Sequence, residues 1–329
     1  MFSGIFTIKA LSPSKQNIIH NLKNNFDSGS RLAKGSGYVI IDAPSTLGLR
    51  NTGVQNLPKA LKNAGLMDRL NATFAGRVQP SMHYDPIRDP ITHLLNGTSI
   101  ALFSKDLSKI VNIEIEKKNF PIVLGGDCSI LIGVHLGLRK IGRYGLFFID
   151  GHSDFYQPRA STTGEVADME LSVVSGRGAN ILSNIDGLKP LVLDDDIVVF
   201  GYRDAEQSMS YGSNDVRNTR MQVLDLSDVR NLGIKKTASL AVSNFLMSED
   251  LSGFWIHIDA DVLDDRIMPA VDYRLGNGGL EFSELSYLLK ILISSQKAIG
   301  MTITIYNPNL DVSGSIAKNF VSCIAKGLL

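Results

Sequence analysis

The stretch Gly145-Leu-Phe-Phe-Ile-Asp-Gly-His-Ser-Asp154 decides how the fold is assigned. Its first half is a continuous apolar run, which is typical of a parallel strand that is buried on both faces. Asp150, His152 and Asp154 then follow at a spacing of two, so an extended chain would point all three side chains to one side. Two carboxylates and an imidazole at a strand end predict a divalent metal site. The alternative interpretation is a polar loop that only caps the strand.

Two further stretches have the same construction. Phe254-Trp-Ile-His-Ile-Asp-Ala-Asp261 is an apolar run that ends in Asp259 and Asp261, and Phe120-Pro-Ile-Val-Leu124 opens into Gly125-Gly-Asp-Cys-Ser129. Parallel sheets gather their sites at the carboxyl ends of the strands. Three strands that end in ligand-type residues therefore favour one shared metal site over a coincidence of polar loops.

The rest of the chain alternates between short apolar runs and helical stripes. Further strands are expected at 38–41, 197–200, 221–224 and 298–305. Helices are expected near 57–64, 104–118, 130–139, 170–175, 237–246, 285–293 and 316–324, with Ser104 as an N-cap, whereas 66–103 gives weak signals. This alternation predicts an α/β protein with one mostly parallel sheet and helices on both faces. We expect a single domain over 36–329, preceded by an extension over 1–35 with a short helix near 16–22.

Composition excludes several classes of protein. Lys+Arg and Asp+Glu balance at 33 each, which gives no electrostatic case for nucleic acid or an anionic membrane. No apolar stretch approaches the roughly 20 residues of a membrane-spanning helix, and the N-terminus lacks the pattern of a signal peptide. The two cysteines, Cys128 and Cys323, form no disulfide framework, so a reducing cytoplasm is the expected location.

The three blocks Gly125–Ser129, Asp150–Asp154 and Asp259-Ala-Asp-Val-Leu-Asp264 resemble those of the ureohydrolase family, which includes arginase, agmatinase and formimidoylglutamase. Family members show the same blocks in the same order. Ile41-Asp-Ala-Pro44 and Asn307-Pro308 extend the similarity, which covers about residue 38 to the C-terminus. The resemblance implies an arginase-like three-layer α/β/α fold, a small-molecule substrate and a homo-oligomer, often a trimer or hexamer.

The resemblance also implies two divalent metal ions, usually manganese, and a metal-bridging hydroxide that attacks the carbon of the substrate. The chain is then a metal-dependent hydrolase of linear amidine-type C–N bonds in guanidino, N-hydroxyguanidino or formimidoyl substrates. Two close metals suit this chemistry because they lower the pKa of a bridging water and clamp the tetrahedral intermediate. By motif, one metal would take Cys128, Asp150, Asp154 and Asp259, and the other Asp150, His152, Asp259 and Asp261. Asp154 would also hold the hydroxide, and Asp127 and Asp264 would orient loops and ligands.

Cys128 is the first departure from the family pattern, which has a metal-binding histidine at this position. A thiolate can bind a metal, and a neighbouring cation would deprotonate it. Such a ligand shifts the preference toward Zn²⁺, Fe²⁺, Co²⁺ or Ni²⁺ and away from Mn²⁺. The alternative is that Cys128 is only a small buried residue, which would leave one metal weak or absent.

Two further departures concern the catalytic groups. Arginases and agmatinases carry a His-Gly pair after the second block, whereas Thr163-Gly-Glu-Val-Ala-Asp-Met169 has no histidine. Glu165 or Asp168 is therefore a candidate for acid–base work, and a solvated or capping role is the alternative for each. Those enzymes also grip the guanidinium with a glutamate where this chain has Ile305. A less basic group, formimidoyl or N-hydroxylated guanidine, fits this pocket better.

Other interpretations remain open from the sequence. A catalytically degenerate ureohydrolase-like protein with a structural or regulatory role would explain the missing groups, although clustered carboxylates are costly without a cation. A deacetylase-like amidohydrolase on a related fold is a third possibility. His257 lies in phase with Asp259 on its strand and is either a ligand's support or a hydrogen-bonded core histidine. Arg203 could bind a substrate carboxylate or form a structural ion pair.

Overall fold

The computed structural model describes residues 37–329 except 247, 249 and 277. The expected extension over 1–35 and its helix near 16–22 lie outside the described residues, so the boundary at 35/36 stays a prediction. The described residues form one eight-stranded sheet in the order β2-β1-β3-β8-β7-β4-β5-β6, and every neighbouring pair of strands is parallel. The predicted single-domain α/β architecture is confirmed.

The strands are β1 (Tyr38–Ala43), β2 (Thr73–Arg77), β3 (Phe120–Gly125), β4 (Gly145–Ile149), β5 (Ile197–Phe200), β6 (Gln222–Leu224), β7 (Phe254–Asp259) and β8 (Ala298–Thr304). The helices are α2 (Leu57–Asn63), α3 (Leu66–Leu70), α4 (Gly97–Glu116), α5 (Ile130–Ile141), α6 (Glu170–Val174), α7 (Asn180–Ser183), α8 (Ala205–Ser210), α9 (Leu226–Leu232), α10 (Ile234–Leu246), α11 (Phe282–Ser294) and α12 (Ser315–Leu328). Of these helices, none is both long and apolar enough to cross a membrane.

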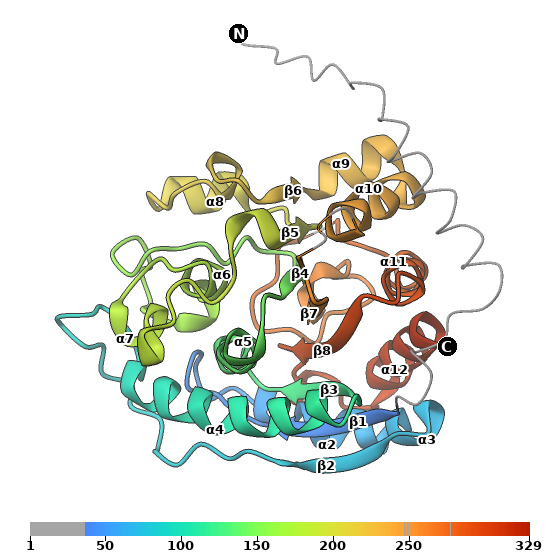
Figure 1. The fold of residues 1–329 in the computed structure, drawn as a ribbon, viewed down its shortest axis with the longest axis horizontal. Coiled ribbons are helices and arrows are strands. Elements are labelled where there is room, and N and C mark those ends of the chain that lie inside the picture. The colour runs from blue at the N-terminus through green and yellow to red at the C-terminus, as the bar shows by residue number, and fades with distance from the viewer. Residues whose placement is uncertain (1–36, 247, 249, 277) are drawn as a thin grey trace, which may run out of the picture.

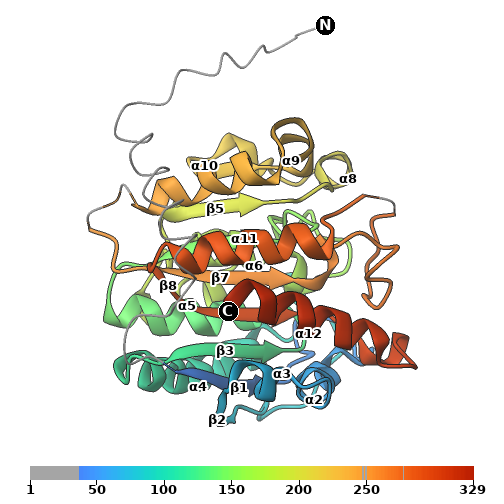
Figure 2. The same ribbon diagram turned by 90° about the vertical axis from the view of Figure 1, so that its right-hand side faces the viewer.

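Helices cover both faces of the sheet, which explains why the central strands are apolar at every position. Phe147 and Ile149 of β4 belong to the core under α2, α3 and α9–α12, whereas Leu146 and Phe148 belong to the core under α4–α7. Figure 1 shows the two helical layers on opposite sides of the strands, and Figure 2 shows the strands stacked from β2 to β5 between them.

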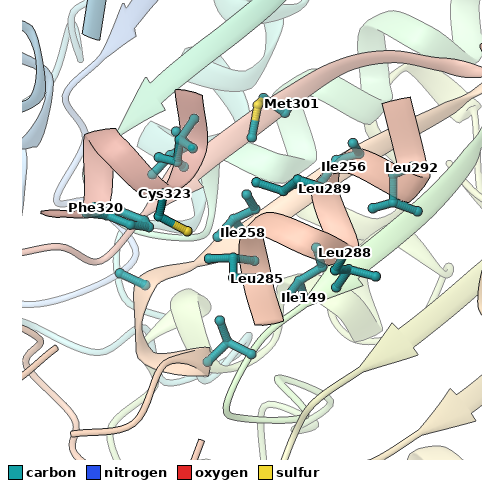
Figure 3. Close-up of a cluster of buried hydrophobic side chains, with 14 of the residues drawn as sticks. Ile149, Ile256, Ile258, Leu285, Leu288, Leu289, Leu292, Met301, Phe320 and Cys323 are labelled. Carbon is teal, nitrogen blue, oxygen red and sulfur yellow. The ribbon is translucent and has the colours of Figure 1, made fainter. Parts of the chain in front are cut away.

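The α11 and α12 layer illustrates how the core is built. The apolar stripe of α11 recurs every three or four residues, so one face of the helix is buried against the sheet. Figure 3 shows this stripe pointing toward side chains of β7, β8 and α12, and the labelled residues are Ile149, Ile256, Ile258, Leu285, Leu288, Leu289, Leu292, Met301, Phe320 and Cys323. The predicted place of Cys323 on the closing helix is confirmed, and its side chain is buried.

Several expected elements differ in extent. The helix expected from Ser104 begins at Gly97, so Ser104 is a buried residue inside α4 and the prediction of an N-cap there was wrong. β2 was missed because it is an edge strand with exposed side chains and little apolar pattern. The short helices α3, α7, α8 and α9 were also missed, since each is too short to show a clear helical period.

Gly126 shows how closely the backbone packs at the end of β3. A Cβ atom at this position would lie 1.8 Å from the carbonyl oxygen of Ser45. The same turn is held by Asp127 N, which donates to Ser45 O, and by Ile305 N, which donates to Gly126 O. The glycine therefore lets three chain segments meet at this edge of the sheet.

We predict that Gly126→Ala lowers the free energy of unfolding by about 1–3 kcal/mol, because the added methyl group must push backbone apart. Urea denaturation measures the change. Gly37→Ala is the matched control: nothing lies within 4 Å of its Cβ position, so its effect is expected within about 0.5 kcal/mol of zero. Equal stability of the two variants would contradict the packing argument.

Candidate active site

The three predicted blocks meet at the carboxyl edge of the sheet. In the order β3-β8-β7-β4, β8 lies between the strand that precedes Cys128 and the strand that ends in Asp259. Cys128 Sγ lies 2.8 Å from Asp259 Oδ2 and 3.0 Å from the Oγ1 atom of Thr304, at the end of β8. Parallel strands thus bring together residues that are 131 positions apart in the chain.

The turns after β4 and β7 depart from the extended geometry that the spacing of two predicted. β4 ends at Ile149, and Asp150 Oδ1 accepts a hydrogen bond of 2.7 Å from His152 N. Asp259 Oδ1 likewise accepts one of 2.8 Å from Asp261 N, so that Asp259 caps the 3-10 turn Ala260–Val262. These side-chain-to-backbone turns, rather than strand alternation, aim the ligand-type groups.

Asp154 adopts a left-handed backbone conformation with φ of 40°. Aspartate tolerates this region better than most residues, and the bend ends the block Asp150–Asp154. The loop is held from behind by Asp204, whose Oδ1 and Oδ2 accept hydrogen bonds from Ser153 N and Ser153 Oγ at 2.9 and 3.2 Å. Asp154 is 5% exposed, so it reaches solvent only through the pocket described below.

His152 pairs with Asp261. The Nδ1 atom lies 2.8 Å from Asp261 Oδ2, and Gly151 N donates to Asp261 Oδ1 at 3.0 Å. Burial disfavours the charged forms of both residues, but their mutual attraction raises the pKa of His152 and lowers the pKa of Asp261. A cation bound here would compete with the imidazole proton for the same carboxylate.

Negative charge concentrates at this edge of the sheet. Burial, followed by the charges of Asp154, Asp259 and Asp261, raises the pKa of Asp150 well above its usual range. Burial and the Asp261 charge raise the pKa of Asp259 in the same way. Carboxylates this close repel one another unless a proton or a metal ion lies between them.

Glu170 belongs to the same cluster, although the sequence motifs did not include it. It is the first residue of α6, is fully buried, and its pKa is raised well above the usual range by burial and by Asp150. Neither carboxylate oxygen has a hydrogen-bond partner among the described residues. A glutamate directly before the largely apolar stretch Leu171-Ser-Val-Val174 was the available signal, but it also fits the ordinary acidic first turn of a helix.

The sequence left the role of His257 open between the support of a ligand and a core histidine. It lies on β7, stacks on Phe148 with ring centroids 5.0 Å apart, and its Nδ1 lies 2.7 Å from Thr302 Oγ1. Burial lowers the pKa of His257 to about 3, so the ring is neutral. Its Nε2 atom is buried and has no hydrogen-bond partner among the described residues.

The donor atoms fit metal binding. One donor atom from each of Cys128, Asp150, Glu170 and His257 lies within 4.8 Å of the others, and Asp150, His152 and Asp261 form a second set under the same limit. Asp150 belongs to both sets, and its Oδ2 is buried without a partner among the described residues. Oxygen atoms that converge without donors leave a cation as the group that satisfies them. The six predicted ligands, with Asp154 and Asp259 included, all lie at this edge.

A pocket of about 180 Å³ opens onto the cluster. This volume is similar to the ~150 Å³ of a cavity that takes up benzene, so it suits a small polar head group. Its floor consists of His152, Asp154, Asp259 and Asp261. Its walls are formed by Leu49, Tyr156, Thr162, Thr163, Glu165, Ala167, Asp168, Gln207, Tyr211, Tyr273 and Ile305.

Glu165 and Asp168, the two acid–base candidates, both line the pocket but differ in their partners. Glu165 is held on both oxygens, by Arg50 Nε at 2.9 Å and by the Tyr273 hydroxyl at 2.8 Å. Asp168 accepts a hydrogen bond on Oδ2 from Ser161 Oγ at 2.8 Å, while Oδ1 has no partner among the described residues. Burial raises the pKa of Asp168 to about 7. Asp168 is thus the better placed of the two for proton transfer.

Ile305 stands in the pocket wall, where the family pattern has a guanidinium-gripping glutamate. Its backbone is left-handed, with φ of 66°, and such a conformation is a genuine outlier for a β-branched residue. The conformation is held by Ile305 N, which donates to Gly126 O. The bend therefore keeps this side chain at the pocket, where it presents no charge.

The supporting residues have structural contacts. Asp127 accepts hydrogen bonds from Gly48 N and Ser129 N, and Asp264 accepts them from Arg266 N and Gly278 N. Both arrangements orient loops at the edge of the site. Arg203 donates to the carbonyl oxygens of Asp261 and Leu263 and lies 3.6 Å from Asp265, outside the pocket lining. Its structural interpretation fits these contacts, and the substrate-binding interpretation does not.

Comparisons with known proteins agree with the fold and with the family resemblance. A model of the Arginase family matches residues 36–328. The arginase of Staphylococcus aureus (strain MRSA252) is 30% identical over 302 residues, which cover 89% of this chain and 97% of that protein. The arginase of Bacillus subtilis (strain 168) is 28% identical over 87% of this chain and 95% of that protein. A crystal structure of Bacillus subtilis arginase superposes with a TM-score of 0.78 at 26% identity, over 89% of this chain and 98% of that one. The chain belongs to the arginase family.

Proposed function

We propose that the protein is a metal-dependent hydrolase of linear amidine-type C–N bonds. The observation that carries the proposal is the pocket floor of His152, Asp154, Asp259 and Asp261, which is continuous with the buried donor atoms behind it. Two divalent ions held there would supply a water of lowered pKa as the nucleophile and would stabilise the charge that develops on the substrate carbon's substituents. The relatives named arginase support a guanidino-type C–N bond as the class of bond that is cleaved.

The chain's own residues divide the remaining tasks. Asp154 faces the pocket from the floor and accepts the hydrogen bond that orients the attacking water. Asp168 Oδ1, for which no hydrogen-bond partner is found among the described residues, holds the proton that the leaving amine takes up. Glu165, fixed by Arg50 and Tyr273, positions the far end of the substrate and does not transfer protons.

The substrate head group is proposed to be less basic than an unsubstituted guanidinium. Ile305 offers no carboxylate to a cation, and the one wall carboxylate with two partners, Glu165, is already matched by Arg50. Tyr156, Tyr211 and Tyr273 give the walls an aromatic character. A formimidoyl or N-hydroxyguanidino group suits such walls better than the arginine side chain does.

The test is a substrate panel on metal-loaded enzyme, with formimidoyl, N-hydroxyguanidino and guanidino compounds and acetyl-lysine. We expect release of formamide, a urea or ammonia from at least one amidine, and no acetate from acetyl-lysine. Asp168→Asn is expected to lower kcat by about 10²–10⁴ with unchanged metal content. Full metal occupancy without turnover of any amidine would instead support the degenerate, structural role, and acetate release would support the deacetylase-like alternative.

Metal binding itself is predicted to stabilise the fold, because the ion relieves repulsion among buried carboxylates. At a hundredfold excess over Kd, the gain is about 2.7 kcal/mol, which raises Tm by several degrees. Thermal denaturation of chelator-treated protein with added Mn²⁺, Zn²⁺, Co²⁺ or Ni²⁺ measures the shift. Asp259→Asn should lose most of it, and Asp106→Asn, an exposed acid on α4, should keep it. Absence of a shift with all four ions would argue against the metal site.

Ile305→Glu is predicted to raise kcat/KM for a guanidino substrate by about ten- to hundredfold. A charge-assisted hydrogen bond from the guanidinium to the new carboxylate contributes about 1.5–3 kcal/mol. The unbranched glutamate also suits the left-handed backbone at this position better than isoleucine does. Ile305→Gln has the same shape without the charge and should show little gain. A similar gain in both variants would mean that shape rather than charge sets the preference.

A further inference from the structure

The thiol end of the site contains a donor set that the family motif does not describe. Cys128 comes from the turn after β3, Asp150 from the turn after β4, Glu170 from the start of α6 and His257 from β7. All four side chains are essentially inaccessible to solvent. Their donor atoms lie within 4.8 Å of one another. Four unrelated segments of the chain therefore deliver a thiol, an imidazole and two carboxylates to one point.

Hydrogen bonding within the protein does not account for these groups. His257 Nε2, Asp150 Oδ2 and both oxygens of Glu170 are buried and have no partner among the described residues. Each such group costs free energy unless something pairs with it, and a buried charge costs most. Two ionised carboxylates cannot pair with each other. Glu170 and Asp154 can share one proton. That proton leaves Asp150 and the imidazole of His257 without a partner, whereas a cation satisfies the carboxylates and also takes the imidazole and sulfur lone pairs.

The imidazole of His257 is oriented as a metal ligand in the tautomer in which Nδ1 donates to Thr302 Oγ1 and Nε2 carries the lone pair. Its Nδ1 lies 2.7 Å from Thr302 Oγ1, and its ring is clamped against Phe148. An imidazole held on one nitrogen presents the other nitrogen in a fixed direction, which is the usual arrangement behind a metal-bound histidine. Cys128 is likewise held, by Thr304 and Asp259.

We propose that Cys128, Asp150, Glu170 and His257 bind one divalent transition-metal ion, with His257 supplying the imidazole that position 128 lacks. Cys128 loses its thiol proton to solvent as the sulfur–metal bond forms. Donor atoms at about 2.0–2.3 Å from a four-coordinate ion lie about 3.3–3.8 Å apart, so donor atoms at the 4.8 Å limit must move closer together by about 1–1.5 Å when the ion binds. The inference rests on the proposed metal-dependent function, and it assigns two ligands, Glu170 and His257, beyond the family motif.

The ligand types select the ion. Thiolate and imidazole favour Zn²⁺, Co²⁺ or Fe²⁺ over Mn²⁺, which prefers oxygen donors. The pocket is lined by His152, Asp154, Asp259 and Asp261 and by none of Cys128, Glu170 and His257. The thiol-bound ion therefore lies behind the pocket floor, and Asp150, which belongs to both donor sets, links it to the oxygen-rich set that faces the substrate.

Co²⁺ titration of chelator-treated full-length protein tests the proposal without turnover. A thiolate ligand gives a near-ultraviolet sulfur-to-cobalt charge-transfer absorption. We expect this band in the wild type and in Cys323→Ser, the control for the second buried cysteine, and its loss in Cys128→Ser. Glu170→Gln conserves the shape of the side chain, and His257→Asn is smaller but keeps a polar group near Thr302. Each variant should weaken the Co²⁺ binding that the band reports by at least about tenfold.

Folding of each variant is checked by circular dichroism, and Glu170→Gln, the isosteric change, decides the result if His257→Asn unfolds. Co²⁺ binding without a thiolate band, or unchanged affinity in Glu170→Gln, overturns the inference. A band that depends on all three of the varied ligands, Cys128, Glu170 and His257, in a protein that hydrolyses no amidine supports the inference and contradicts the proposed function. Turnover of an amidine with Mn²⁺ in Cys128→Ser, together with no thiolate band in the wild type, contradicts the inference and supports the proposed function.

Discussion

The structure depends on a concentration of buried negative charge at the carboxyl edge of its sheet. Asp150, Asp154, Asp259 and Glu170 all have raised pKa values, and burial is the first cause in each case. His152 does not balance this charge, because its imidazole is paired with Asp261. The sheet, rather than local attraction, holds these groups together: β4, β7 and β8 are locked by apolar cores on both faces. The free energy gained by packing the core thus offsets the repulsion among the carboxylates, and a bound cation would remove that repulsion.

The sequence predicted the parts of the site that follow from the sheet. Apolar runs that end in Asp150 and Asp259 could be recognised because a parallel strand buried on both faces has few other sequence solutions. The detailed aim of the side chains could not be predicted, because it arises in turns where Asp150 and Asp259 bond to the backbone two residues on. β2 was not predicted because it is an exposed edge strand, and its sequence shows little apolar pattern. Apolar periodicity in a sequence arises from burial of one face, so an exposed strand cannot be recognised by it.

Glu170 and His257 show a second limit on what sequence reveals. Each has an ordinary explanation in its own segment, one as an acidic first helical turn and the other as a core histidine. Only the packing of α6 against the end of β4 and the neighbouring position of β7 make them members of one cluster. The proposed ligands come from four separate segments, so no fixed spacing in the sequence connects them. Comparison of motifs therefore finds the ligand positions that the family shares and does not find Glu170 and His257.

The exchange at position 128 is best understood through the geometry of the sheet. β3 and β7 are separated by β8, and their ends lie close enough for Cys128 to contact both Thr304 and Asp259. A metal ion at this point can accept a ligand from either strand end, because donor atoms of Cys128 and His257 lie within 4.8 Å of each other. An imidazole that moves from the β3 turn to His257 on β7 keeps a nitrogen donor in the set, and the vacated position can then hold a smaller, softer ligand. In the pocket wall no such exchange of ligands compensates for Ile305, which provides no carboxylate at its position. Under the proposed ligand set, the exchange at position 128 keeps a complete donor set for the metal ion, whereas Ile305 changes which head group the proposed pocket admits.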